Sequence, residues 1–258
     1  MQLWKVLQDF LDHSDDKKSV YSQILEAKPE IDKISLMKDM IFFFFAGHDT
    51  TSRNLATLMF NLKKNPKYYD TCYNEAIKVL GVTNRGQVKD LIVVEKFDEL
   101  EYLTWWIKES LRHDNPAIST LGYQALESIQ IWGVPLPKGS KIFLSIHGLH
   151  YNLNQWKDPE KFISDRFNHE SNYFFIPSET EKKSRSPYSF IPFSFGSRLC
   201  AGKSLATIEA KALSIYMLMK FDFEANLKWI YKIWKSFSVQ AKIENCQKLL
   251  RIFNLTSL

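Results

Sequence analysis

Residues 193–202 read Phe193-Ser194-Phe195-Gly196-Ser197-Arg198-Leu199-Cys200-Ala201-Gly202, which places one cysteine on a loop bracketed by two glycines. Gly196 and Gly202 allow the backbone to bend tightly and leave no side chain between the loop and a flat partner. Arg198, two residues before Cys200, offers a cation to an acidic group. The residues after the loop have the apolar spacing of a helix. Together these features predict that Cys200 is an iron ligand.

A buried structural cysteine at the start of a helix is the alternative interpretation of Cys200. It is the commoner fate of a lone cysteine, which behaves as a small apolar residue in most proteins. It gives no reason, however, for a phenylalanine, two glycines and an arginine at this spacing. The iron-ligand interpretation accounts for all of them and is therefore favoured.

The spacing resembles the haem-binding signature of the cytochrome P-450 (haem-thiolate monooxygenase) superfamily. The matching residues are Phe193, Gly196, Arg198, Cys200 and Gly202, followed by Ala206 and Glu209. The resemblance implies haem b (iron protoporphyrin IX) as the cofactor. It makes Cys200 the axial ligand of the iron, Arg198 the partner of a haem propionate and Phe193 a neighbour of the sulfur. In this family the thiolate pushes electron density onto the iron and favours O–O cleavage.

A long helix is predicted from Ile34 to Lys64, and residues 41–46 are apolar almost all round, so we expect its centre to be buried. By the resemblance this is the distal helix crossing the haem, where Ala46 and Gly47 leave room for dioxygen. Asp49 and Thr50 match the acid–alcohol pair that delivers protons during dioxygen activation. The Thr50 hydroxyl can bond the Ala46 carbonyl, four residues earlier. Taken alone, the segment also fits a buried helix with a solvated acidic turn, and the downstream Cys200 favours the functional interpretation.

A further helix is predicted over residues 99–114, with Asp98 and Glu101 resembling a capping box. It carries Glu109 and Arg112 three residues apart, which alone would be an ordinary surface ion pair. By the family resemblance, Glu109, Arg112 and Arg166 form a buried charge network that is structural rather than catalytic. Three residues depart from the usual family pattern around these positions, namely Tyr151, Ser164 and Asp165.

The predicted fold is mainly α with small β-sheets and corresponds to the C-terminal half of the cytochrome P-450 fold. With 258 residues, 45% of them hydrophobic, the chain should form one globular unit. We interpret residues 1–258 as a single partial domain: a lead-in helix and loop over 1–33, then 34–258 from the distal helix through the cysteine loop to the C-terminus. A helix from Pro66 to Leu80 is expected to bury Cys72. Residues 127–132 and 141–146 are β-rich, 168–192 irregular, and a buried helix follows Cys200 to about Lys220.

Composition limits the classes of function and location. Three scattered cysteines suit a reducing compartment rather than a disulfide framework, and no basic run with interleaved aromatics suggests nucleic acid. The longest apolar run, residues 40–47, is too short to cross a bilayer. We expect membrane contact only through an N-terminal part missing from this chain. A full-length eukaryotic relative is expected at the cytosolic face of the endoplasmic reticulum membrane.

The hypothesis that follows is a monooxygenase that inserts one atom of dioxygen into a small, apolar organic substrate, with electrons from a reductase. Arg198, Lys203 and Lys211 are candidates for a basic surface that docks this reductase. Ala46, Thr50 and residues 117–121 are candidates for substrate contact. The rival hypothesis is a truncated, non-catalytic fragment that binds haem or lacks it. A third, a branch that rearranges peroxides without electrons, is disfavoured by Asp49 and Thr50.

Overall fold

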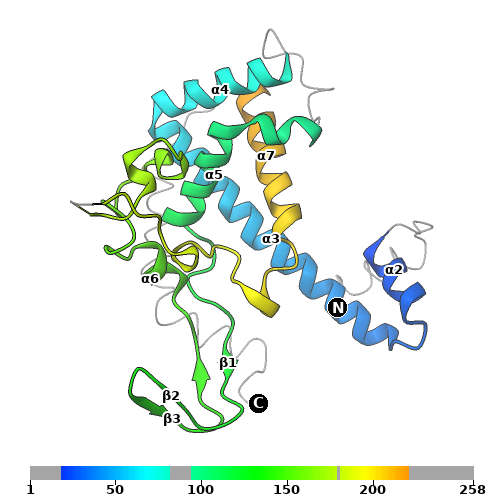
Figure 1. Cartoon of the computed structure of the whole chain (residues 1–258). Helices are drawn as coiled ribbons and strands as arrows, with labels where there is room; N and C mark the ends of the chain where they lie inside the picture. Colours follow the sequence, from blue (N-terminus) through cyan, green and yellow to red (C-terminus); the bar gives the residue numbers. More distant parts are fainter. Residues whose placement is uncertain (1–18, 82–93, 179–180, 221–258) are drawn as a thin grey trace.

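The computed structural model describes residues 19–81, 94–178 and 181–220. Its main elements are helices, joined by long irregular segments and two small sheets (Figure 1). The helices are α2 (Val20–Ala27), α3 (Lys33–Lys64), α4 (Pro66–Leu80), α5 (Glu101–His113), α6 (Ile146–His150) and α7 (Lys203–Lys220). The predicted fold class, mainly α with small sheets, is confirmed. The interpretation of residues 1–258 as one partial domain stays a prediction.

The hydrophobic core lies where the C-terminal half of α3 meets α4, α5 and α7. Each helix contributes fully buried side chains, represented by Leu62 of α3, Cys72 of α4, Trp106 of α5 and Leu218 of α7. The expectation that Cys72 is a core residue is confirmed. Burial raises the pKa of its thiol far above the ordinary range, which keeps it protonated and unreactive.

Local contacts set the limits of α3 and α4, whose bounds agree with the predicted ones to within about a residue. The Asp32 carboxylate accepts hydrogen bonds from the backbone N–H groups of Ile34 (3.2 Å) and Ser35 (3.1 Å), which caps the start of α3. Pro66 occupies the first turn of α4, where its missing N–H costs nothing. Gly81 ends α4 in the left-handed conformation at φ +70°.

The start of α5 differs from the expected capping box. Asp98 lies in a short 3₁₀ helix, Val94–Glu99, and α5 begins at Glu101 without a side-chain cap from its own N-terminal residues. A tertiary contact replaces the cap: the Glu75 carboxylate of α4 accepts hydrogen bonds from the N–H groups of Tyr102 (2.7 Å) and Leu103 (2.9 Å). The N–H groups at the start of α5, which have no partner within the helix, therefore donate to a carboxylate of α4.

Two small antiparallel sheets form the β part. Strand β1 (Tyr123–Gln124) pairs with β4 (Lys141–Ile142), and β2 (Ile129–Ile131) pairs with β3 (Val134–Leu136). Trp132 (φ +47°) and Gly133 (φ +83°) form the β2–β3 turn, whose two left-handed residues match the twist of a hairpin. The predicted β-rich runs therefore hold strands, but the strands are shorter and the β1–β4 pairing was not predicted.

The centre of α3 is exposed, which overturns the expectation that it is buried. All residues from Phe42 to Thr50 have exposed side chains, and the four phenylalanines 42–45 are 52–63% exposed. In Figure 1 this stretch crosses the gap between the helical body and α2. The apolar pattern indicates a need for cover, and the described residues do not provide it.

Helix α7 extends to Lys220 as predicted, but it is only partly buried. Leu205, Ile208 and Leu213 are 41–62% exposed, and the residues of this helix that join the core lie from Ala210 to Met219. The helix predicted over residues 3–11 and the C-terminal segment with Cys246 lie outside the described residues. Within the described part of the chain, no helix combines the length and apolarity needed to cross a bilayer.

Candidate functional site

The cysteine loop is closed by hydrogen bonds between its two ends. The Cys200 N–H donates to the Phe193 carbonyl (2.9 Å), and the Ser194 N–H donates to the Ile191 carbonyl (3.0 Å). Ser194 (φ +64°) and Gly196 (φ +66°) both adopt the left-handed conformation, so the backbone turns sharply within this closed loop. The Cys200 side chain is exposed, which excludes the alternative of a buried structural cysteine.

The two glycines of the loop have different roles in this geometry. Gly196 has a positive φ and open space around it, so its backbone conformation is the reason for glycine. At Gly202, an added Cβ would lie 3.9 Å from Cys200 Sγ and would narrow the approach to the thiol. Arg198 is exposed and makes no ion pair with any residue that the structure describes. The loop thus exposes both a thiol and a cation, two residues apart in sequence.

The Ala46–Thr51 segment of α3 shows the predicted hydroxyl contact. Thr50 Oγ1 donates to the Ala46 carbonyl at 2.7 Å, which confirms this hydrogen bond. Asp49 is exposed, and an added Cβ at Gly47 would meet nothing within 4 Å. Helix α7, which follows the cysteine loop, packs against α3. Among the described residues, no hydrogen bond or ion pair joins this segment to the cysteine loop. The roles of Asp49 and Thr50 stay predictions.

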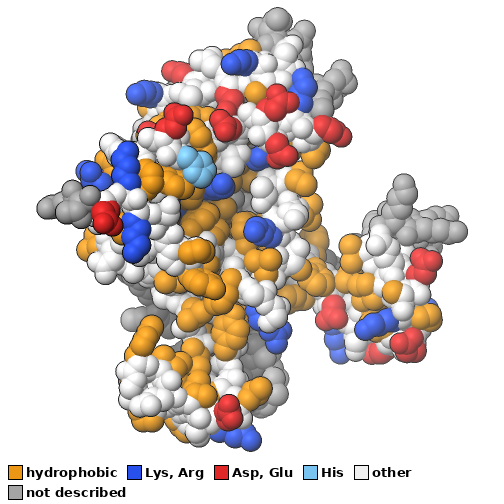
Figure 2. Space-filling model, in the orientation of Figure 1, with side chains coloured by type: hydrophobic (Ala, Val, Ile, Leu, Met, Phe, Trp, Pro, Cys, Tyr) orange, Lys and Arg blue, Asp and Glu red, His pale blue; other side chains and the backbone are white. Residues whose placement is uncertain are grey.

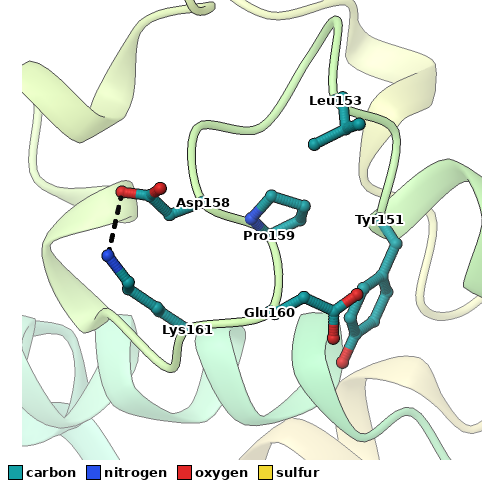
Figure 3. A pocket seen from close by; sticks show the side chains of 6 residues that line it. All are labelled: Tyr151, Leu153, Asp158, Pro159, Glu160 and Lys161. Carbon is teal, nitrogen blue, oxygen red and sulfur yellow. Dashed lines mark ion pairs between the residues drawn. The ribbon is translucent and has the colours of Figure 1, made fainter.

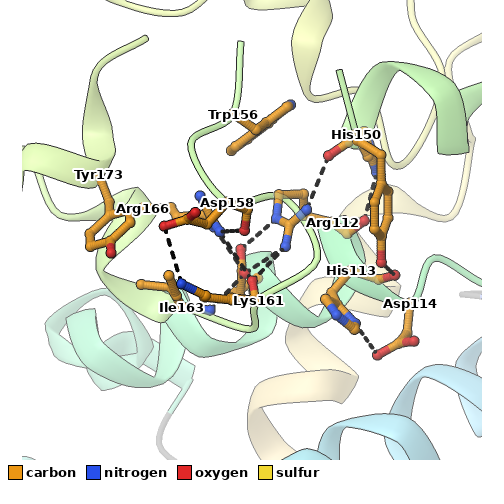
Figure 4. Close-up of polar contacts among 12 residues, drawn as sticks. Arg112, His113, Asp114, His150, Trp156, Asp158, Lys161, Ile163, Arg166 and Tyr173 are labelled. Atoms are coloured by element: carbon orange, nitrogen blue, oxygen red, sulfur yellow. Dashed lines mark hydrogen bonds and ion pairs between the residues drawn. The ribbon is translucent and has the colours of Figure 1, made fainter. Parts of the chain in front are cut away.

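The structure brings Glu109, Arg112 and Arg166 together in the buried network that the family resemblance implies. Figure 4 shows the two arginines of this network. Arg112 binds Glu109 through two parallel hydrogen bonds of 2.8 Å, from Nε to Oε2 and from Nη2 to Oε1. Arg166 Nε donates to Glu109 Oε1 at 3.2 Å, and the Ile163 N–H donates to the same oxygen at 2.8 Å. One carboxylate therefore serves two guanidinium groups and a backbone donor.

Other guanidinium N–H groups of Arg112 and Arg166 donate to backbone carbonyls of residues 157–161. Arg112 Nη2 donates to the Lys161 carbonyl (3.2 Å), and Arg166 Nη2 donates to the carbonyls of Asp158 (2.6 Å) and Lys161 (3.1 Å). Arg166 Nη1 donates to the Lys157 carbonyl. Burial lowers the pKa of Arg166, and the nearby Glu109 carboxylate opposes that effect. Each guanidinium nitrogen of Arg112 and Arg166 therefore has a hydrogen-bond partner. We call Glu109, Arg112 and Arg166 the clamp; its structural rather than catalytic role stays a prediction.

Comparison with known proteins decides the family. The family model described as Cytochrome P450 matches residues 3–242, nearly the whole chain. The chain belongs to the cytochrome P450 family. It is 36% identical to Cytochrome P450 4F5 of Rattus norvegicus over 179 residues, which are 69% of this chain and 31% of that protein.

Two other P450 relatives carry names that state an activity. Leukotriene-B4 omega-hydroxylase 3 of Mus musculus is 34% identical over 180 residues, or 69% of this chain and 32% of the relative. The Ultra-long-chain fatty acid omega-hydroxylase of Homo sapiens is 33% identical over 180 residues, or 69% and 31%. The chain spans about a third of the length of the curated relatives that it matches.

Two residues of this P450 chain that sequence reasoning missed support the clamp. Arg185 donates to the carbonyls of Arg166 (2.7 Å) and Tyr173 (2.8 Å), and its guanidinium lies 4.2 Å from the ring centroid of Trp156. His150 is fully buried between α5 and the segment before the cysteine loop. Local spacing could not reveal these contacts, because Arg185 and His150 bind partners in other segments of the chain.

Two further expectations are settled by this structure. Lys211 is wrong as a surface cation for a reductase, because it is 7% exposed and its Nζ donates to the Phe97 carbonyl at 2.7 Å. Tyr151 departs from the family pattern. Its hydroxyl donates a hydrogen bond to the His113 carbonyl at 2.7 Å, and its ring centroid lies 5.3 Å from Arg112 Cζ. Tyr151 therefore packs beside the Glu109–Arg112–Arg166 network without breaking its hydrogen bonds.

An open cavity of about 450 Å³ lies beside the clamp (Figure 3). Asp158 and Lys161 form an ion pair of 3.5 Å on its wall. Its lining residues are Tyr151, Leu153, Asp158, Pro159, Glu160 and Lys161. None of the residues predicted to bind haem, dioxygen or substrate lines this cavity, so it is separate from the candidate site.

Proposed function

We propose that this chain carries the haem-binding part of a haem-thiolate monooxygenase, with Cys200 as the axial ligand. The observation that supports it is an exposed thiol on a loop closed by the Cys200–Phe193 hydrogen bond, in a chain of the P450 family. Haem is the cofactor of this family in general.

The residues of the loop fit such a group. A thiolate is the ligand, and Arg198 supplies an exposed cation for a propionate. Phe195 and Leu199 of the same loop are 38% and 46% exposed and offer apolar contact to a flat macrocycle. Gly202 keeps the space beside the sulfur open. Phe193 packs against the hydrophobic core and anchors the base of the loop.

When bound, the haem supplies dioxygen activation with two electrons and transfer of one oxygen atom to the substrate. The chain's own contribution on α3 is proton handling. The Thr50 hydroxyl hydrogen is directed to the Ala46 carbonyl, so Thr50 Oγ1 presents its lone pairs and can accept a hydrogen bond from water. Asp49 directly precedes Thr50 on the helix, and its carboxyl group exchanges protons with that water.

The reductase and substrate are proposed by class. Arg198 and Lys203 are exposed cations at and just after the cysteine loop and suit an acidic electron donor. Two relatives are named for omega-hydroxylation, one of leukotriene B4 and one of ultra-long-chain fatty acids. We therefore propose a long-chain carboxylic acid as substrate, hydroxylated at its terminal carbon. Location at the cytosolic face of the endoplasmic reticulum membrane is likewise a proposal.

The test is the reduced, carbon-monoxide difference spectrum of the chain expressed with haem supplied. We expect a red-shifted, thiolate-type Soret band in the wild type and in the matched control Cys246→Ser, and no such band in Cys200→Ser. A band that persists in Cys200→Ser contradicts the assignment of the ligand. A wild type without the band has two explanations: the chain is a non-catalytic fragment, or it lacks residues that must cover the haem. The same spectrum of a chain extended at its N-terminus distinguishes them, because only the second explanation predicts that the band then appears.

A further inference from the structure

His150 is a fully buried imidazole whose two nitrogens both have backbone partners. Nδ1 lies 3.2 Å from the Arg112 carbonyl oxygen, and Nε2 lies 3.1 Å from the Ile191 nitrogen. A carbonyl can only accept and a backbone N–H can only donate, so Nδ1 carries the hydrogen and Nε2 is the acceptor. The ring is therefore neutral and held in one tautomer.

The position of His150 is set by the charge network. Its carbonyl accepts a hydrogen bond from Arg112 Nη1 at 3.0 Å, so His150 and Arg112 are joined twice, once through each backbone carbonyl (Figure 4). Arg112 itself is fixed by two hydrogen bonds to Glu109. The Phe190 ring packs against the imidazole with a centroid separation of 5.3 Å. The imidazole is thus held on the same rigid base as the clamp.

Ile191, the partner of Nε2, lies two residues before the cysteine loop and forms its base. The Ile191 carbonyl accepts a hydrogen bond from the Ser194 N–H, and the hydrogen bond from the Cys200 N–H to the Phe193 carbonyl then closes the loop. Beyond that base, residues 195–200 are exposed. Asn115 Nδ2 supplies a second tether, to the carbonyl of the following residue, Pro192, at 3.3 Å. The direction in which the loop leaves the body is therefore fixed by backbone contacts at residues 191 and 192.

We propose that His150 is a positioning residue for the Cys200 ligand: through Ile191 it links the Glu109–Arg112 network to the base of the cysteine loop and holds the thiol in the orientation that an axial ligand needs. The proposal rests on the proposed function of Cys200. His150 has no place among the haem contacts that the sequence predicts, and it acts only through the backbone of the loop.

The first test needs no haem. Hydrogen–deuterium exchange of the full chain is compared for wild type, His150→Phe, His150→Gln and His147→Phe. Phenylalanine keeps a ring without either nitrogen, whereas glutamine keeps one donor and one acceptor. His147 is an exposed histidine on the same helix and gives the matched control. We expect amides of residues 189–200 to exchange about ten-fold faster or more in His150→Phe, and close to the wild-type rate in the other two variants.

The second test uses the haem-loaded chain. His150→Phe should lower the thiolate-type fraction of the carbon-monoxide Soret band at least several-fold, and His150→Gln should restore most of it. If neither the wild type nor the chain extended at its N-terminus gives a thiolate-type band, the proposed function fails. The exchange experiment then still decides whether His150 holds the loop, so the two failures are distinguishable.

Three results would overturn the proposal. One is unchanged exchange at residues 189–200 in His150→Phe. Another is an equal rise of exchange in α4 and α5, which would make His150 an ordinary core residue. The third is a His150→Gln variant that exchanges as fast as His150→Phe, because the hydrogen bonds would then not carry the effect.

Discussion

Glu109 is the single carboxylate on which two buried guanidinium groups depend. All three side chains are at most 1% exposed, and Glu109 Oε1 accepts hydrogen bonds from both Arg112 and Arg166. Breaking a buried ion pair by removing one partner leaves an uncompensated charge, which costs more than the pair contributes over an apolar replacement. The stability of this region therefore depends on Glu109 remaining an anion.

Replacing Glu109 with glutamine should lower the free energy of unfolding by about 3–5 kcal/mol, because two buried cations lose their counterion. Urea unfolding followed by far-UV circular dichroism measures this change. Glu101→Gln, an exposed glutamate at the start of the same helix, should change the free energy by roughly 0.5 kcal/mol or less. Equal losses in the two variants would show that Glu109 has no special role.

Burial lowers the pKa of His150 to about 4, against 6.5 for an exposed histidine, and the nearby Arg112 guanidinium adds to this effect. The unfolded chain therefore binds this proton between pH 6.5 and 4 while the folded chain does not. Stability is full above pH 6.5 and falls as the pH drops through this window, by roughly 3 kcal/mol in total from this group. Unfolding free energies measured from pH 7 to 4 should show this slope in wild type and lose that part of it in His150→Gln. A parallel slope in both proteins would contradict the assignment.

At the scale of elements, helix α5 begins with a cap borrowed from α4. The half-buried Glu75 carboxylate accepts from the N–H groups of Tyr102 and Leu103. Burial raises the pKa of Glu75, and the two N–H donors oppose that rise. The orientation of α4 against α5 is therefore coupled to the capping of a helix start.

Glu75→Ala should lower the free energy of unfolding by about 1–2 kcal/mol, since two N–H groups lose their acceptor. Glu75→Gln should lose less, because it keeps one carbonyl oxygen and avoids burying a charge. Asp98→Ala is the informative control: the sequence names Asp98 as the cap, whereas the structure leaves it exposed, so its loss should be roughly 0.5 kcal/mol or less. If Asp98→Ala lowered the free energy of unfolding more than Glu75→Ala does, Asp98 rather than Glu75 would be the cap of α5.

At the scale of the whole molecule, the exposed centre of α3 is the main departure from an ordinary soluble surface. Figure 2 shows apolar side chains gathered over much of the visible face. Phe42, Phe43, Phe44 and Phe45 each expose more than half of their side chain. Their ring contacts are with one another and with His48 on the same helix. Contiguous exposed apolar surface favours association.

The double variant Phe42→Gln/Phe45→Gln should reduce self-association of the chain in sedimentation velocity. Its free energy of unfolding should change by roughly 0.5 kcal/mol or less, since neither ring is packed in the core. Leu58→Ala, at a fully buried α3 position, should instead cost about 2–5 kcal/mol and leave association no weaker. A stability loss in the double variant comparable to that of Leu58→Ala would show that these phenylalanines are covered after all.

By itself the sequence determined the features that depend on local spacing. Helix α3, with Asp32 before it, and α4, between Pro66 and Gly81, follow from caps, proline, glycine and apolar period. The Thr50–Ala46 bond follows because residues four apart are neighbours on a helix. The Glu109–Arg112–Arg166 network was predicted through the family resemblance, because the Glu109-x-x-Arg112 helix precedes the Arg166-Phe167 segment in the chain as it does in the family.

Only the tertiary structure decided the contacts between residues far apart in sequence. The Glu75 cap of α5, the burial of Lys211 and the His150 link to Ile191 each join segments that no local pattern connects. The exposure of α3 was mispredicted for the same reason, because an apolar period reports that a surface needs cover and not whether cover is present. Local propensity limits the elements, whereas burial and hydrogen-bond partners depend on how those elements meet in space.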